Sequence, residues 1–364
     1  MVTAVSFGDI YQGKRVLITG HTGFKGSWLS VWLNRLGAKV AGIGLDPDTD
    51  PEHWQFCQAL LDGEIEDHRI DIADIEAVRR IVGAFEPEVV FHLAAQPLVR
   101  RSYNMPVETW TTNVIGTVNV LEVCRSVPGL KAIVVVTSDK CYDNRSLDRG
   151  YNEEDALGGH DPYSASKAAT ELVASSYRRS FFSEAEAPLL ATARAGNVIG
   201  GGDWSEDRLI PDLYRAVAAG SELEIRSPDA TRPWQHVLDA LSGYLLLGQR
   251  LLLGERGCAA AWNFGPDSTG TCSVRELLSR MQVYWPGFSW HVGQEVQLHE
   301  AVILQLDIGK AVRELQWQPV WALEQAIANT AEWYSAYLEN GEVLSAKQLD
   351  TFLDDAHAKG AVWI

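Results

Sequence analysis

The 364-residue chain is long enough for one large two-lobed domain or two closely packed domains. Its formal net charge of -17 at pH 7 repels nucleic acid and anionic membrane surfaces, so neither is expected as a partner. The five cysteines lack the spacing of a disulfide framework, which indicates a reducing, cytoplasmic location. No signal peptide, membrane span or metal-binding motif is predicted.

Short apolar runs alternate with longer helical patterns through the first half of the chain. Strands are predicted at 15–19, 39–45, 88–93, 131–137 and 189–194, and helices at 24–36, 75–85, 107–127 and 162–180. This alternation is typical of βαβ units and a parallel sheet. Because a glycine pattern fills the first strand-to-helix turn, we predict an α/β fold with a Rossmann-type doubly wound sheet rather than a closed barrel.

The pattern changes after about Gly196. Helices are predicted at 208–219, 237–253, 274–283 and 321–338, with a short strand at 260–264 and a helical tail after Asn340. We expect residues 1–198 to form a dinucleotide-binding Rossmann domain, to which segments of 236–268 return. Residues 199–364 are expected to form a smaller C-terminal lobe that binds the substrate over the C-terminal edge of the sheet.

The glycine pattern predicts a dinucleotide site. Gly20 permits a tight turn, Gly23 lets the backbone approach a pyrophosphate, and Gly26 lets the helix pack on the strand. Free N–H groups at the start of the helix favour phosphates. Thr22 and Phe24, between these glycines, belong to the expected site. The alternative is an ordinary glycine-rich turn.

An acidic residue indicates which dinucleotide is bound. Asp46 ends the second predicted strand, where a carboxylate can bind both hydroxyls of the adenosine ribose and would repel a 2′-phosphate. The sequence therefore predicts NAD rather than NADP. The alternative is that Asp46 opens the turn that continues with Pro47.

Four further residues are expected at the cofactor. Asp71, followed by Ile72, either contacts the adenine amine or is an acid at a helix N-terminus, and the sequence leaves both readings open. Ala94 and Ala95 follow the third predicted strand, where small side chains let the cofactor backbone pass.

Tyr163 and Lys167 predict the chemistry. Four residues apart in a predicted helix, they share one helix face. A nearby ammonium favours phenolate and is expected to lower the tyrosine pKa. Such a tyrosine can take a hydroxyl proton while the carbinol hydride leaves for a nicotinamide. The alternative is a surface tyrosine beside a solvated lysine.

Three consecutive polar residues end the fourth predicted strand, at the edge that opens onto the cofactor crevice. Ser138 can hydrogen-bond a substrate hydroxyl beside Tyr163. Asp139 and Lys140 exceed what alcohol oxidation needs and indicate a further proton-transfer step, such as an elimination. Alternatively, they form a local ion pair that caps the loop.

The chain resembles the extended short-chain dehydrogenase/reductase superfamily and, within it, the nucleotide-sugar 4,6-dehydratases, most of all the branch that acts on CDP-glucose. The segments that carry the likeness are 21–30, 92–103, 136–144, 158–167, 194–204 and 232–247. They run through most of the chain to about Pro266.

The resemblance implies a cycle in which Tyr163 deprotonates the C4 hydroxyl of glucose, NAD takes the C4 hydride, and water leaves across C5 and C6 with Asp139 as the acid. The hydride then returns to C6, and C5 is reprotonated. In the dTDP- and GDP-sugar relatives a glutamate follows this aspartate as the presumed C5 base, and here Lys140 takes its place. That exchange fits the CDP-glucose branch and leaves the C5 base open.

The resemblance also implies a substrate site, a quaternary state and a pathway. The candidates for the diphosphate are arginines, of which Arg208 and Arg232 are favoured together with Asn197 and His236. Members of the superfamily pair through helices that include the tyrosine helix, so a homodimer or homotetramer is expected. The implied pathway makes a deoxyhexose for a surface polysaccharide such as O-antigen.

Two alternative functions remain. A nucleotide-sugar 4-epimerase, or a dehydratase for another nucleotide sugar, would use the same Tyr163 and Lys167, but an epimerase would not need Asp139 or Lys140. A non-catalytic protein that senses the cofactor would be expected to lose Tyr163 or Lys167, and the sequence retains both.

Overall fold

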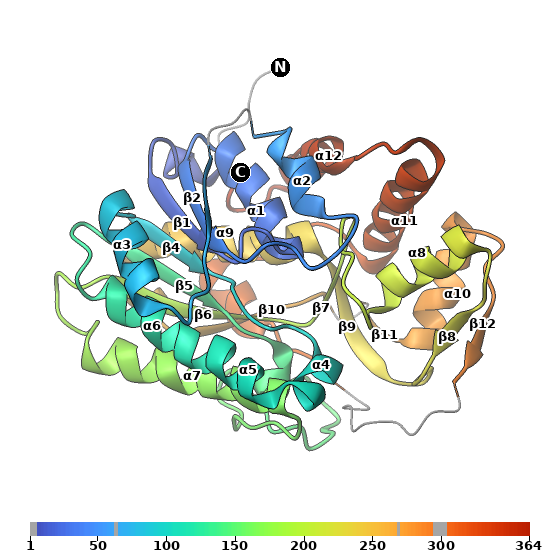
Figure 1. Cartoon of the computed structure of the whole chain (residues 1–364), viewed down its shortest axis with the longest axis horizontal. Helices are drawn as coiled ribbons and strands as arrows, with labels where there is room; N and C mark the ends of the chain where they lie inside the picture. Colours follow the sequence, from blue (N-terminus) through green and yellow to red (C-terminus); the bar gives the residue numbers. More distant parts are fainter. Residues whose placement is uncertain (1–5, 62–64, 268–269, 294–303) are drawn as a thin grey trace.

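The computed structural model describes residues 6–61, 65–267, 270–293 and 304–364, which form a large lobe and a smaller one (Figure 1). The large lobe contains a seven-stranded sheet of order β10-β6-β5-β4-β1-β2-β3, in which every pairing is parallel. Its strands are β1 (Arg15–Thr19), β2 (Lys39–Gly44), β3 (Ile65–Arg69), β4 (Val89–His92), β5 (Ala132–Val136), β6 (Leu189–Ala195) and β10 (Ala261–Phe264).

Helices cover both faces of this sheet, as the strand sequences require. In β5, Val134 packs into the core beneath α1 (Phe24–Arg35) and α9 (Val237–Leu252). Its neighbours Ile133 and Val135 pack on the opposite side. The helices there are α3 (Ile75–Phe85), α6 (Gly116–Cys124) and α7 (Pro162–Ser180). Because strands buried on both faces are apolar throughout, the sheet is doubly wound, and the predicted Rossmann-type fold is confirmed.

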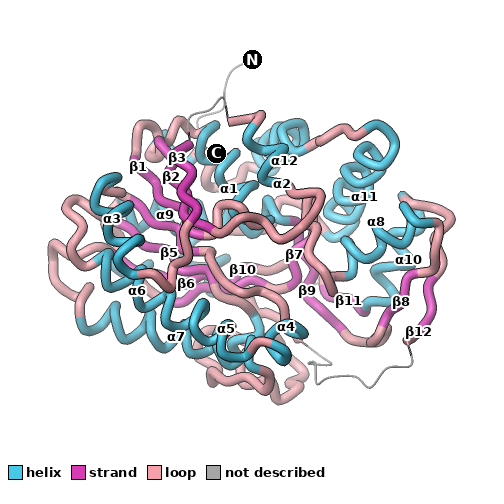
Figure 2. Tube along the Cα trace, viewed as in Figure 1, coloured by secondary structure: helices cyan, strands magenta, loops and turns pink. Residues whose placement is uncertain are grey.

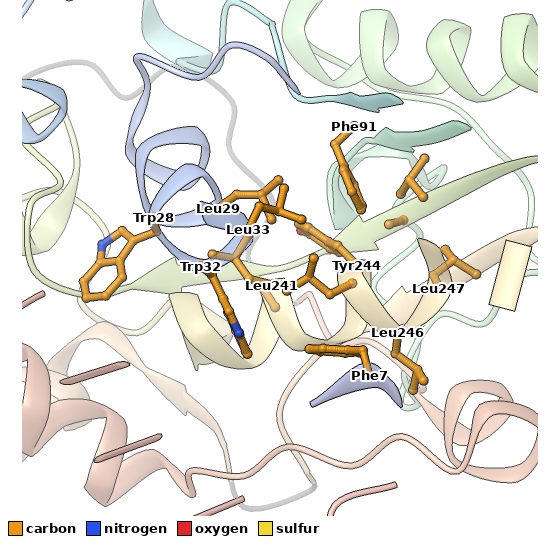
Figure 3. Packing of buried hydrophobic residues seen from close by; sticks show 14 of the residues in the cluster. Phe7, Trp28, Leu29, Trp32, Leu33, Phe91, Leu241, Tyr244, Leu246 and Leu247 are labelled. Atoms are coloured by element: carbon orange, nitrogen blue, oxygen red, sulfur yellow. The ribbon is translucent and has the colours of Figure 1, made fainter. Parts of the chain in front are cut away.

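The core between α1 and α9 is rich in aromatic side chains (Figure 3). Trp28, Trp32 and Tyr244 are fully buried in it. The C-terminal helix α12 (Ser345–Lys359) closes this side, where the ring centroid of Phe352 lies 5.7 Å from that of Trp32. The C-terminal helix therefore belongs to the same core as the first helix.

The smaller lobe follows β6 and contains short strands and three helices (Figure 2). Its strands are β7 (Asn197–Ile199), β9 (Thr231–His236) and β11 (Thr271–Ser273) in one sheet, and β8 (Leu223–Ile225) with β12 (Trp290–Val292) in another. Its helices are α8 (Leu209–Ala219), α10 (Val274–Tyr284) and α11 (Leu323–Asn340).

The remaining helices follow β2 and β4. They are α2 (His53–Gln58), α4 (Val99–Asn104) and α5 (Pro106–Trp110). The helix predicted at 107–127 is a succession of α5, a π-helical stretch (Thr111–Ile115) and α6. The edge strand β3 was not predicted, because its sequence IEDHR is polar and half-exposed rather than apolar.

A buried ion pair fastens α7 to the sheet. Glu171 of α7 accepts hydrogen bonds from Arg194 of β6 at 2.8 Å, from Thr137 at 2.5 Å and from Thr192 at 2.8 Å. Burial alone raises the pKa of Glu171, but the charge of Arg194 and these hydrogen bonds outweigh it, so the pKa is lowered. Arg194 therefore holds a helix in place.

We predict that Glu171→Gln lowers the free energy of unfolding by about 3 kcal/mol at pH 7, because it leaves the charge of Arg194 buried and unpaired. A lowered carboxyl pKa contributes stability above the unfolded pKa of about 4.3, which is lost as pH falls through the folded pKa. The free energy of unfolding of the variant should therefore change less between pH 7 and pH 4 than that of the wild type. Urea unfolding at pH 7 and at pH 4 measures both effects.

Glu122→Gln is the matched control, since Glu122 forms a partly exposed pair with Arg125. Its expected cost is below about 1 kcal/mol. If both variants lost the same free energy of unfolding, the buried Glu171–Arg194 pair would stabilise the fold no more than the partly exposed pair does.

Candidate active site

A cleft of about 910 Å³ lies where the strands of the large sheet end. The residues that follow β1, β2, β3, β4, β5 and β6 all contribute to its wall. The other wall comes from the segment between β7 and β9 of the smaller lobe. This is the crevice in which open α/β sheets bind their ligands.

Most of the residues singled out from the sequence line this cleft. They are Gly20, Thr22, Gly23, Phe24, Gly26, Asp46, Asp71, Ile72, Ala94, Ala95, Ser138, Lys140, Tyr163, Lys167, Asn197, Arg208 and Arg232. Asp139 lies directly behind this lining, and His236 lies away from it.

The glycine loop is shaped by contacts that a side chain would block. Gly20 has a φ of +77°, and a Cβ on it would come within 2.7 Å of the backbone nitrogen of Ala94. A Cβ on Gly26 would collide with the carbonyl oxygen of Gly20. A Cβ on Gly23 would meet no described atom closer than 3.5 Å. Packing within the protein therefore requires glycine at positions 20 and 26. Gly23, in contrast, leaves open space in front of the helix N-terminus.

The acids at the far end of the cleft are free to meet a ligand. The side chain of Asp46 is 86% exposed and accepts a hydrogen bond from Arg69 at 3.2 Å. Asp71 also lines the cleft while its carboxylate accepts from the backbone N–H of Ala73 at 2.8 Å. Asp71 thus lies at the cleft, the N-cap of α3 is Asp74, and contact of Asp71 with an adenine amine stays a prediction.

Helix α7 brings Tyr163 and Lys167 into the cleft. Its start is fixed by Asp161, whose carboxylate accepts from the backbone N–H of Ser164 at 2.9 Å, and by Pro162 in the first turn. Tyr163 and Lys167 are 7% and 6% exposed. Burial is the main reason that the pKa of Lys167 is lowered to about 8.

The expected lowering of the tyrosine pKa is wrong for the protein alone. Burial raises the pKa of Tyr163 to about 12, although a hydrogen bond with Ser138 opposes the rise. Desolvation of the phenolate thus outweighs the neighbouring groups of the chain. An additional positive charge in the cleft would be required to favour phenolate.

The end of β5 holds a compact polar group. Ser138 donates to Asp139 at 2.9 Å, and Lys140 donates to the same carboxylate oxygen at 3.3 Å. Lys140 also lies 3.5 Å from the side-chain oxygen of Asn197. The second carboxylate oxygen of the fully buried Asp139 has no hydrogen-bond partner in the described part of the chain. Asp139 and Lys140 therefore form the local ion pair that the sequence offered as an alternative. The second carboxylate oxygen of Asp139 remains without a donor among the described residues.

The arginines of the smaller lobe separate into two groups. Arg208 pairs with Asp203 at 2.8 Å and, like Arg232, lines the cleft. Arg194 of β6 and Arg215 of α8 lie outside the cleft. Arg194 is bound to Glu171 within the large lobe.

His236 is a correction to the predicted site. Its ring is buried outside the cleft, with Nδ1 accepting from the backbone N–H of Leu238 at 3.3 Å at the start of α9. The ring centroid lies 4.6 Å from that of Trp321. Burial lowers its pKa to about 3, so the ring stays neutral. His236 therefore joins α9 to its neighbours and does not face a substrate.

Lys25 is a cleft residue that sequence reasoning missed. It stands in the glycine loop between Phe24 and Gly26, both of which were expected at the cofactor, while Lys25 itself was given no role. Its ammonium faces the cleft and lies 3.5 Å from the hydroxyl of Tyr244 on α9. A charged residue inside a glycine pattern was the available signal.

Membrane-spanning helices and metal-binding clusters are both absent from residues 6–61, 65–267, 270–293 and 304–364. None of their helices is long and apolar enough to cross a membrane. In the same ranges, no three histidine, cysteine, aspartate or glutamate side chains gather in a way that could hold a metal ion.

A parallel doubly wound sheet, a glycine loop after β1 and the Tyr163–Lys167 pair on α7 define an extended short-chain dehydrogenase/reductase. Residues 17–254 match the model of the family described as GDP-mannose 4,6 dehydratase. The chain belongs to this family of nucleotide-sugar 4,6-dehydratases.

One relative agrees with this family assignment, and two solved structures share the fold. The chain is 47% identical to a CDP-glucose 4,6-dehydratase of Salmonella typhimurium over 92% of its own length and 94% of the relative. The fold is similar to that of the dTDP-glucose 4,6-dehydratase DesIV of Streptomyces venezuelae, solved with NAD and TYD bound, with a TM-score of 0.76 at 24% identity over 90% and 97% of the two chains. An epimerase of Methanothermobacter thermautotrophicus gives a TM-score of 0.78 at 24% identity over 94% and 96%.

Proposed function

We propose that the protein is an NAD-dependent dehydratase that converts CDP-glucose into CDP-4-dehydro-6-deoxyglucose. The observation that carries this proposal is the Asp139–Lys140 pair beside Tyr163, in a chain 47% identical to a CDP-glucose 4,6-dehydratase. The pair is surplus to a simple oxidation, and its lysine replaces the glutamate of other nucleotide-sugar dehydratases.

The cleft fits NAD. Gly20 and Gly26 hold the loop in a shape that aims the free N–H groups of α1 into the cleft, and Gly23 leaves room for a pyrophosphate. In this proposal the exposed carboxylate of Asp46 binds the adenosine ribose. When bound, NAD supplies the hydride acceptor for C4 and the hydride donor for C6 within one turnover.

Tyr163 takes the proton of the C4 hydroxyl. Its phenol lies in a dry site beside Ser138, which can hold the same substrate oxygen. The high tyrosine pKa of the protein alone would be opposed by the positive charge that oxidised NAD brings. Lys167 shares the helix face and, in this proposal, orients the cofactor ribose and the tyrosine.

The Asp139–Lys140 pair performs the elimination. Moving one proton across the 3.3 Å contact turns the ion pair into a carboxylic acid and an amine. The acid protonates the C6 hydroxyl, which leaves as water, while the amine takes the C5 proton that the 4-ketone has acidified. Both transfers together restore the ion pair, so the pair serves as acid and base in one step.

The smaller lobe holds the nucleotide diphosphate. Arg208 and Arg232 line the cleft and offer fork-shaped donors for phosphate oxygens, with Asn197 beside them. Trp234 also lines this part of the cleft and can wall the nucleotide pocket. In this proposal the protein works in the cytoplasm, which its five buried free thiols support.

A substrate panel tests the function. The purified protein is incubated with CDP-, dTDP-, UDP- and GDP-linked hexoses, with and without NAD, and the products are followed by mass spectrometry. We expect loss of one water from CDP-glucose alone. Loss of water from a different nucleotide sugar would overturn the substrate, and an unchanged mass with an inverted C4 centre would show an epimerase.

Two variants separate the steps in this panel. Asp139→Asn should slow dehydration by at least about 100-fold, the contribution typical of a positioned acid. An epimerase would largely survive that change. Tyr163→Phe should abolish C4 oxidation while NAD binding persists, so turnover in that variant would contradict the assigned base.

The glycine loop gives a separate prediction for the cofactor. Gly26→Ala should weaken NAD binding by at least about 100-fold, because the added methyl group pushes α1 away from Gly20. Gly83→Ala in α3 is the control, since a Cβ there meets nothing within 4 Å. Calorimetric titration with NAD measures both. Equal affinities in the two variants would place the cofactor elsewhere.

A homodimer is proposed from an exposed apolar surface on the large lobe, near the α5 and α7 helices that Figure 1 shows at one side of that lobe. The surface consists of large apolar side chains on α5, the π-helical stretch after it and α7, together with the residue that joins α4 to α5. Its members are Met105, Val107, Trp110, Ile115 and Leu172. A second copy of the chain would bury this surface through the helix that carries the tyrosine, as the family resemblance implies.

Leu172→Glu is predicted to convert the dimer into a monomer, because it would bury a carboxylate against apolar side chains. Light scattering after size-exclusion chromatography measures the mass. Leu253→Glu is the control, since Leu253 is 58% exposed at the end of α9, away from this surface. A monomeric wild type, or a Leu172→Glu dimer, would contradict the proposal.

A further inference from the structure

We propose that Lys25 shifts the balance between the two redox forms of the bound nicotinamide: its ammonium favours the reduced ring, which is uncharged, over the oxidised ring, which is positively charged. Lys25 would thereby promote the oxidation of C4. This inference rests on the proposed function in one respect, that the cleft holds NAD.

The position of Lys25 is set by the glycine loop. It occupies the first turn of α1, immediately before Gly26, and its ammonium lies in the cleft. The 3.5 Å contact with the hydroxyl of Tyr244 anchors it from α9 (the Tyr244 ring is visible in Figure 3). Tyr244 is fully buried, so this anchor holds the ammonium at the inner end of the cleft.

The charges around Lys25 identify that inner end as the catalytic end. Lys25 interacts electrostatically with Asp139 and Lys140 at the end of β5, with Lys167 on α7 and with Arg208 before α8. Tyr244 in turn interacts with Tyr163 and Asp139. A nicotinamide that receives a hydride from a carbon beside Tyr163 must therefore bring its ring within range of the Lys25 ammonium.

Lys25 differs from Arg208 and Lys140 in having no carboxylate partner of its own. Arg208 pairs with Asp203, and Lys140 pairs with Asp139. In the described part of the chain, Lys25 forms no ion pair, and its hydrogen bond goes to a neutral phenol. Its charge is therefore not cancelled locally, and it acts on whatever enters the cleft.

The surroundings of Lys25 disfavour its charged form. Burial, together with the charges of Arg208 and Lys167, lowers the pKa of Lys25 to about 7, with Asp139 opposing the shift. An apolar side chain would fill a first-turn position without that penalty. A function that depends on the positive charge would explain why a lysine, and not an apolar residue, occupies this position. In a dehydratase the hydride must stay on the cofactor while water leaves, and a cation beside the ring favours that state.

The test compares the two forms of the cofactor instead of turnover. Lys25→Met keeps the length of the side chain and removes its charge, and Lys25→Arg keeps the charge. Dissociation constants for NAD and NADH are measured at pH 6, where Lys25 is charged, for each variant freed of cofactor. Their ratio reports the potential of the bound couple.

We expect Lys25→Met to bind NAD more tightly relative to NADH by about tenfold, the size that one partly screened unit charge supports. Lys25→Arg should keep the wild-type ratio to within about threefold. If Lys25→Met does not fold by circular dichroism, Lys25→Gln replaces it, with the same expected change.

An unchanged ratio in the uncharged variant would overturn the inference. Equal weakening of NAD and NADH would also overturn it, because it would assign Lys25 to the cofactor phosphates. Failure of the wild type to bind either nucleotide would overturn the proposed function as well. The two failures are thus distinguishable in one experiment.

Discussion

The close contact between Gly26 and the carbonyl of Gly20 is the constraint on which the site depends. It brings the first turn of α1 against the end of β1, so that the N–H groups of the helix face the cleft. The same turn carries Lys25 to the end of β5 and the start of α7. Any side chain at Gly26 would move α1, and with it the cleft wall and the charge of Lys25.

Helix α7 supplies the second half of the arrangement. Tyr163, Lys167 and Glu171 follow one another at intervals of four residues, so they share one face of the helix. The first two line the cleft, and the third is locked to Arg194 and to the hydroxyls of Thr137 and Thr192 beneath it. The Glu171–Arg194 ion pair thus fixes the position of Tyr163 and Lys167, because a shift of α7 would move both side chains together.

The large lobe could be predicted from the sequence because its strands are buried on both faces. Strand β1 and helices α3 and α7 begin and end at the predicted residues, since apolar runs, an N-terminal proline and an aspartate cap mark them clearly. Strand β3 escaped prediction because an edge strand can be polar. The three-residue strands β7, β8, β11 and β12 are too short for any periodic pattern, and only their pairing partners define them.

The site was predictable to the extent that its chemistry is local in sequence. The glycine loop, the β5 end and the α7 face each occupy a few consecutive residues. His236 failed because strand alternation would place it on the same face as Arg232, whereas it is the last residue of β9 and its ring caps the start of α9. Lys25 was overlooked because its importance arises from α7, α8 and α9, which approach it only in the folded chain.

The same distribution of charge explains how an acidic protein can accept an anionic substrate. The chain carries a net charge of -17, yet Lys25, Lys140, Lys167, Arg208 and Arg232 all line one cleft. Acidic partners hold two of these cations in place, at Asp139 and Asp203. A dinucleotide and a sugar nucleotide together bring four phosphate groups, which this cluster can neutralise at close range. The general field thus disfavours large polyanions, while the cleft remains selective for small ones.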